Sequence, residues 1–106
     1  MQLVEIVINC PDRDTATRIA ERLVEARLAA CANIGSGIDS IYRWRGAVER
    51  AAEVPLRVKT RAGHFDAVAA QAAALHPWEE PAITAVAFVA TPSYRDWVLA
   101  ETDPAR

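Results

Sequence analysis

The spacing of apolar residues changes several times along the chain, and each change marks a new element. Residues 3–9 (LVEIVIN) are rich in β-branched side chains and predict a strand. Apolar residues fall on both of its faces, as is typical of a strand that is covered on both sides. Over residues 14–27 the apolar positions recur at helical spacing, so we expect a helix whose start is capped by Asp12 or Asp14.

Residues 30–60 form two extended runs around a tight turn. The first run contains Gly-Ser-Gly at positions 35–37, which indicates a bulge or bend rather than a strand end. Arg45 and Gly46 predict a short hairpin turn between the runs. Pro55 confines part of the return run to a sheet edge or a bulge, because proline cannot donate to a strand ladder.

The last part of the chain predicts a helix, a strand and a second, shorter helix. Helical spacing covers residues 63–75, and a strand that is apolar on both faces covers residues 82–90. Thr91 and Pro92 form an N-cap followed by a first-position proline, which opens the short helix. We expect residues 102–106 to fray.

The order of elements is β-α-β-β-α-β with a terminal helix, which predicts an α+β fold of the ferredoxin-like type. Right-handed crossovers would place both main helices on one face of the sheet. The other face would have no helix over it, although the first and the last of the predicted strands are apolar on both sides, and the hairpin would overhang its own domain. Because exposed apolar sheet and long free edges favour association, we expect a homo-oligomer.

Composition narrows the range of functions. A length of 106 residues predicts a single domain over residues 1–106. The net charge of −2 argues against an electrostatic grip on nucleic acid or on an anionic membrane. The N-terminus has no basic region before its strand pattern, so we expect no signal peptide. Two cysteines cannot build a disulfide framework, so we expect free thiols and a cytoplasmic location.

Cysteine, histidine and carboxylate side chains supply the candidate metal chemistry. Cys10 lies at a strand-to-helix corner, where a helix N-terminus could lower the pKa of its thiol, whereas Cys31 reads as a structural residue. His76 follows a helix end and has Glu79 and Glu80 close by. These side chains could bind a divalent cation, or they could equally cap the helix and face water.

Other polar and aromatic residues of the hairpin are ambiguous. Lys59 is the one lysine in a chain with 11 arginines. It fits either a role that needs a compact charge or a strand residue whose amine reaches into water. Glu49 and Glu53 would share one face of a strand. The simplest interpretation is that both side chains lie in water at an edge of the sheet. Tyr42 and Trp44 also share a face and fit a core or an interface better than a base-binding surface.

No nucleophile elbow, phosphate-binding loop or dinucleotide motif is present. Four segments nevertheless follow one another in a specific order: AACANI, SIYRWRGAVERAAEVPLRVKT, HPWEEPAI and YRDW. In this order they resemble the CutA family of divalent-cation tolerance proteins, over about residues 3–100. Each segment alone would be a weak signal.

The resemblance implies a ferredoxin-like homotrimer, similar in architecture to the PII signalling proteins. It implies a role in tolerance to copper and other divalent metals, with no enzymatic reaction and no required cofactor. It also implies a cleft between subunits, lined here by Cys31, Asn33, Trp44, Glu53, Lys59, His76 and Glu79. Trp78 stands where the family usually has a tyrosine, so the aromatic ring of the cleft is kept without its hydroxyl.

A copper contact carried over from the resemblance would use His76, with Cys10 or Glu79 as partners. Ile8 occupies the place of a cysteine that the family uses in its first strand. Three other interpretations stay open. The first is a PII-like regulatory module that binds a small anion through Lys59 in clefts between subunits. The second is an enzyme that uses the acid–base groups of the cleft, and the third is a purely structural oligomer.

Overall fold

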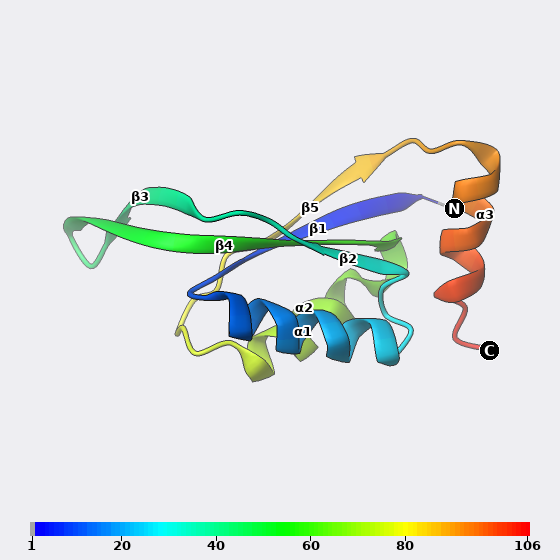
Figure 1. The fold of residues 1–106 in the computed structure, drawn as a ribbon, viewed down its shortest axis with the longest axis horizontal. Coiled ribbons are helices and arrows are strands. Elements are labelled where there is room, and N and C mark those ends of the chain that lie inside the picture. Colours follow the sequence, from blue (N-terminus) through cyan, green and yellow to red (C-terminus); the bar gives the residue numbers. More distant parts are fainter. Residues whose placement is uncertain (1) are drawn as a thin grey trace.

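An antiparallel sheet forms the centre of the computed structural model, which describes residues 2–106. Two helices cross one face of this sheet and a third lies at one end (Figure 1). The elements are β1 (Leu3–Cys10), α1 (Arg13–Glu25), β2 (Cys31–Ile34), β3 (Ile38–Trp44), β4 (Ala47–Arg61), a 3-10 turn (Ala62–His64), α2 (Phe65–Leu75), β5 (Ile83–Phe88) and α3 (Pro92–Glu101). The strand order is β2-β4-β1-β5, with β3 paired to β4 alone. This arrangement confirms the predicted ferredoxin-like α+β fold.

Helix α1 begins and ends on specific backbone contacts. The Asp12 carboxylate accepts a hydrogen bond from the backbone N–H of Thr15 at 2.8 Å, and this bond holds the pKa of Asp12 below its usual value. The helix ends two residues before the predicted position, because Arg27 takes a left-handed conformation with φ of 60°. The N–H of Leu28 then reaches back to the carbonyl oxygen of Leu23 at 3.0 Å and closes the last turn.

The predicted bulge divides the first extended run into β2 and β3. Residues 35–37 stand opposite only two residues of β4, so one strand carries an extra residue here. The N–H of Gly35 donates to the carbonyl oxygen of Pro55 at 2.9 Å. A Cβ atom on Gly35 would lie 2.9 Å from Cγ of Pro55, which explains the glycine. Pro55 therefore lies in a bulged stretch of a central strand and not on an edge.

The hairpin of β3 and β4 extends away from the body of the molecule (Figure 1). Arg45 and Gly46 connect the strands with φ angles of 50° and 84°, as a type I′ turn requires. The first half of β4 pairs with β3, and its second half pairs with β1 and β2. One 15-residue strand therefore belongs both to the hairpin and to the main sheet.

The hydrophobic core lies between the sheet and helices α1 and α2. Alternate residues of β1 and β4 point into it together with one face of each helix, and its buried members include Val4, Ile6, Ile8, Ile19, Leu23, Leu56, Val58 and Val68. The opposite face of the sheet is more polar than expected. Glu5, Arg57 and Lys59 form ion pairs across its middle strands, and its apolar exposure is concentrated on β5.

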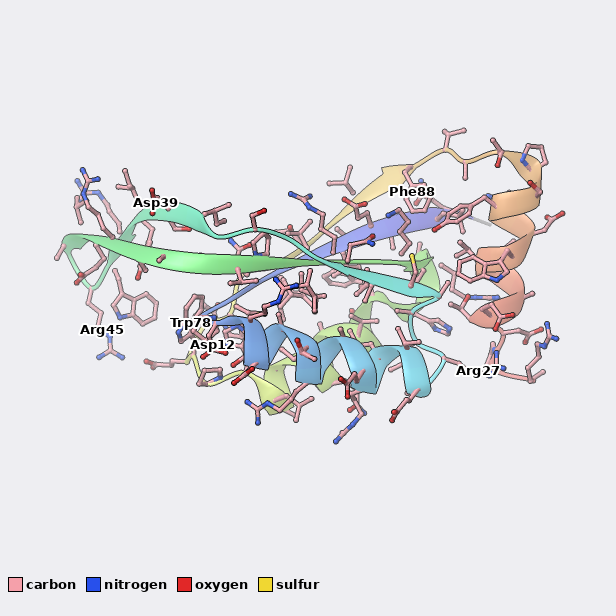
Figure 2. All side chains as sticks on the ribbon, in the orientation of Figure 1. Asp12, Arg27, Asp39, Arg45, Trp78 and Phe88 are labelled. Atoms are coloured by element: carbon pink, nitrogen blue, oxygen red, sulfur yellow. The ribbon has the colours of Figure 1, made fainter. Side chains whose placement is uncertain are left out.

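Side chains from other elements hold helix α3 at its C-terminal end, and Figure 2 labels one of them, Arg27. Arg27 donates to the Glu101 carbonyl oxygen at 3.0 Å, Arg61 donates to that of Leu99, and Nε2 of His64 lies 2.8 Å from that of Thr102. Cationic side chains suit this end of a helix. The expectation that residues 102–106 all fray is wrong at Thr102, which is fully buried. No helix within residues 2–106 is long and apolar enough to cross a membrane.

Candidate functional site

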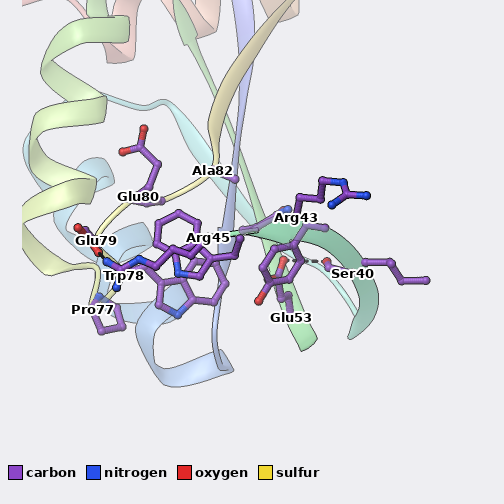
Figure 3. A pocket seen from close by; sticks show the side chains of 14 residues that line it. Ser40, Arg43, Arg45, Glu53, Pro77, Trp78, Glu79, Glu80 and Ala82 are labelled. Atoms are coloured by element: carbon purple, nitrogen blue, oxygen red, sulfur yellow. Dashed lines mark hydrogen bonds and ion pairs between the residues drawn. The ribbon is translucent and has the colours of Figure 1, made fainter. Parts of the chain in front are cut away.

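A groove of about 890 Å³ lies between the β3–β4 hairpin and the loop of residues 76–82 (Figure 3). We call it the lateral groove. The hairpin supplies one wall, and the proline-rich loop after α2 supplies the other. The side chains that matter below are Ser40, Tyr42, Trp44, Arg45, Glu53, Trp78, Glu79 and Glu80.

His76 lies behind this groove, where α2 ends, and its ring is buried. The backbone N–H of Trp78 donates to Nδ1 of His76 at 3.2 Å. Because Nδ1 accepts this bond, the neutral ring carries its proton on Nε2, which donates to the carbonyl oxygen of Asn9 at 2.8 Å. Both ring nitrogens are thus engaged within the chain, and neither offers a free lone pair.

Cys10 is fully buried at the end of β1. Burial, with a smaller contribution from the carboxylates of Asp12 and Glu53, raises the pKa of its thiol to about 11. The expectation of a reactive thiol with a lowered pKa is therefore wrong. The helix that follows cannot offset burial and two nearby negative charges.

Glu79 and Arg45 connect the two walls of the lateral groove. Their side chains form an ion pair, although both are largely exposed. The Arg45 guanidinium also lies over the ring of Trp44, 5.3 Å from its centre. An exposed pair of this kind contributes little to stability, on the order of 0–1 kcal/mol. It does bring a cation, an indole and a carboxylate together at the mouth of the groove.

The three proposed metal contacts do not form a preformed metal centre within one chain. His76 uses both nitrogens, Cys10 is a buried thiol, and Glu79 is paired with Arg45. Among residues 2–106, no three His, Cys, Asp or Glu side chains lie close enough together to hold a metal ion. A divalent cation would need at least one of these groups to leave its present partner.

Glu53 is the buried charge of the lateral groove. Its side chain comes from the first half of β4 and is 5% exposed, although its position suggested a solvated strand edge. The hydroxyl of Ser40 donates to its Oε1 at 2.8 Å. Glu49, four residues earlier on the same strand and nearer the turn, stays exposed.

A second polar group lies on the open face of the sheet, outside the lateral groove. The Lys59 amine contacts Glu5 Oε2 at 3.4 Å and Asn33 Oδ1 at 3.3 Å. Arg57 reaches the other oxygen of the same carboxylate at 3.4 Å. One carboxylate therefore serves two cations, and Lys59 is engaged within its own chain.

Cys31 lies beside Lys59 in the strand register and contacts α3. Its sulfur is 3.3 Å from the hydroxyl of Tyr94. This hydrogen bond, together with burial, raises the pKa of Tyr94 to about 12. The pair thus joins the edge strand β2 to the terminal helix.

The residues expected to line one cleft therefore fall into two groups within a single chain. Trp44, Trp78 and Glu53 meet in the lateral groove, whereas Cys31, Asn33 and Lys59 lie on the open sheet face. Sequence reasoning missed Ser40, Arg45, Glu5 and Tyr94 as partners. Ser40 could have been found, because the hairpin turn fixes a register that sets it diagonally across from Glu53. Tyr94 gave no such signal, since it comes from a helix 63 positions away.

Fold and site together define a ferredoxin-like α+β protein with an extended hairpin and a groove at its root. A family model described as "CutA1 divalent ion tolerance protein" matches residues 4–101. The chain belongs to this family. The family description names a tolerance function and no chemical reaction.

Individual relatives agree with the family match. A "Divalent-cation tolerance protein CutA" of Thermus thermophilus is 41% identical over 98 residues, which cover 92% of this chain and 95% of the relative. A "Protein CutA homolog" of Xenopus laevis is 37% identical, and the match spans 86% of this chain but only 61% of that longer protein. The crystal structure of CutA from Xylella fastidiosa superposes with a TM-score of 0.92 at 38% identity, covering 97% of this chain and all of that one.

Proposed function

We propose that this protein acts in divalent-cation tolerance as a non-enzymatic cytoplasmic homotrimer, with copper as the principal cation. The family match and the names of the relatives support the tolerance role. The two free cysteines, Cys10 and Cys31, support a reducing compartment. The proposed trimer rests on one observation, the exposed apolar surface of the hairpin.

The β3–β4 hairpin has apolar side chains that its own chain leaves uncovered. Five large ones are between 39% and 60% exposed: Ile38, Ile41, Tyr42, Trp44 and Val48. β3 also has one strand edge with no partner among residues 2–106, since it pairs with β4 alone. An apolar ribbon with a free edge is a hazard in a monomer and a ready interface in an oligomer. Further copies of this chain are the occupants we propose.

Copper contact in this proposal goes through His76, with Glu79 as its partner. His76 is in the loop that forms one wall of the lateral groove, and Glu79 forms an exposed ion pair with Arg45. Binding costs His76 one of its two hydrogen bonds, so affinity is expected to be modest. Cys10 is left out, because its thiol is buried and protonated at neutral pH.

We do not extend the proposal to a small anion at Lys59. Its amine already contacts Glu5 and Asn33 within the chain. An anion would have to compete with the Glu5 carboxylate for that charge.

Native mass spectrometry of the chelated protein, followed by titration with Cu(II), tests both parts. We expect a species of about three times 11.6 kDa before any metal is added. Ile41→Lys should shift it to monomer, whereas Val24→Lys, at an exposed position of α1, should not. A monomeric wild type would refute the assembly. Saturable uptake of copper that is lost in His76→Ala and kept in His64→Ala would support the contact, and no specific uptake would refute it.

A further inference from the structure

We propose that helix α3, together with residues 89–91 before it, is a strap that opens as a unit while the rest of the fold stays closed. Arg27 is the residue that holds the strap shut. The proposal goes beyond the tolerance function and is independent of it, since it concerns neither the hairpin nor the lateral groove. It depends on three features: sparse packing under α3, hydrogen bonds concentrated at one end of that helix, and backbone strain at Arg27.

The strap covers one end of the sheet with few apolar contacts. Val98 is the one buried residue between Pro92 and Glu101. Leu3 projects to the face that α1 and α2 leave open, and it is 1% exposed without being part of the core. Strand β1 begins beside α3 (Figure 1), and Leu3 and Arg95 line a common hollow of about 460 Å³. Sparse apolar packing of this kind is typical of an element that opens locally.

The hydrogen bonds that hold the strap are concentrated at its C-terminal end. Arg27 donates to the Glu101 carbonyl oxygen at 3.0 Å and reaches the carboxylate of the same residue at 3.4 Å. Two further basic side chains contact carbonyl oxygens nearby. At the N-terminal end Tyr94 contacts β2, but the N-cap residue Thr91 makes no side-chain hydrogen bond to the helix. Weakening the C-terminal end should therefore favour opening of the whole helix.

Arg27 has a left-handed backbone conformation with φ of 60°, at the position after a helix where glycine is usual. A side chain there adds strain that glycine would avoid. The arginine that bears this strain is also the one that bonds the end of α3, so it links the last turn of α1 to the last turn of α3. Arg27→Gly would relax the turn and remove the link, whereas Arg27→Ala would remove the link alone.

Native-state hydrogen exchange of the chelated, assembled protein in low concentrations of urea, followed by mass spectrometry, tests the proposal. We expect the α3 amides to exchange faster than those of β1 and β4. Their rates should respond little to urea, because opening the strap exposes little surface. The β1 and β4 amides should respond steeply, since they exchange through global unfolding. Arg27→Ala should speed the exchange of α3 roughly tenfold.

Two further variants separate the link from its surroundings. Arg27→Gly should speed α3 exchange as much as Arg27→Ala does, yet unfold at a higher urea concentration, because a relaxed turn stabilises the open and the closed strap alike. Arg22→Ala removes another arginine of α1, whose partner is Gln71 on α2, and should leave α3 exchange unchanged. Equal rates and urea responses in α3 and β1 would overturn the proposal, and so would equal α3 exchange in the Arg27→Ala and Arg22→Ala variants.

Discussion

The backbone N–H of Trp78 donates a hydrogen bond to Nδ1 of His76, and the two rings lie 4.8 Å apart at an angle of 56°. With the second bond from His76 to Asn9, this contact fixes the loop after α2 against the end of β1. The imidazole therefore helps to position the loop wall of the lateral groove, together with the hydrogen bond from the Asn9 N–H to the Ala82 carbonyl oxygen at 3.2 Å.

His76→Ala should lower the free energy of unfolding by about 2–3 kcal/mol. The substitution removes the ring contact and leaves the Trp78 N–H and the Asn9 carbonyl oxygen without their partner. Urea denaturation of the chelated protein measures the change. Trp78→Phe keeps the backbone N–H and an aromatic ring, so it should cost about 1 kcal/mol or less. Equal losses in the two variants would contradict the positioning role of His76.

Stability should fall as the pH rises from 9 to 11. The folded-state pKa of Cys10 is raised from 9.0 to about 11, so the unfolded chain loses this proton first. The contribution is therefore fully present below pH 9 and decreases as the pH approaches 11, by about 2 kcal/mol. Tyr94 acts in the same direction, with a pKa raised to about 12.

Urea midpoints of wild type and Cys10→Ala at pH 8 and at pH 11 measure this effect. The variant should lose less stability between the two pH values than wild type does. An identical loss in both proteins would show that Cys10 does not contribute.

Thr60→Val should stabilise the protein by about 1 kcal/mol. The Thr60 hydroxyl is buried, and no residue among positions 2–106 forms a hydrogen bond with it. Valine keeps the shape and removes the unpaired group. Thr102→Val is the matched control, because the Thr102 hydroxyl accepts from Arg61 Nε at 3.0 Å and donates to the Val98 carbonyl oxygen at 2.8 Å. Thermal unfolding should shift upward for the first variant and downward for the second.

Gly35→Ala should destabilise the protein by about 1–3 kcal/mol. The added Cβ would meet Cγ of Pro55 at 2.9 Å, at the bulge where β2 gives way to β3. Gly63→Ala adds the same methyl group where nothing lies within 4 Å, so it should be close to neutral. Calorimetric melting of both variants decides the matter, and equal melting temperatures would count against a tight contact at the bulge.

Local sequence signals predicted the hairpin turn and the bulge, because each depends on a few adjacent residues such as Arg45 and Gly46. They failed where a distant element decides the outcome. Helix α1 ends early at Glu25, ahead of Arg27, whose side chain contacts the end of α3, and the Thr102 hydroxyl is held by Arg61. Glu53 is buried and lines the same groove as residues 77–82, a proximity that no spacing within the strand reveals.

The length of β4 has a mechanical consequence. Its second half is buried at Leu56 and Val58, while its first half ends in an exposed ribbon. Residues 54–61 of this strand are part of the main sheet, whereas residues 47–53 project with the hairpin. The two parts meet opposite the bulge at residues 35–37. Because one continuous strand runs through both parts, the core fixes the direction in which the hairpin leaves the sheet.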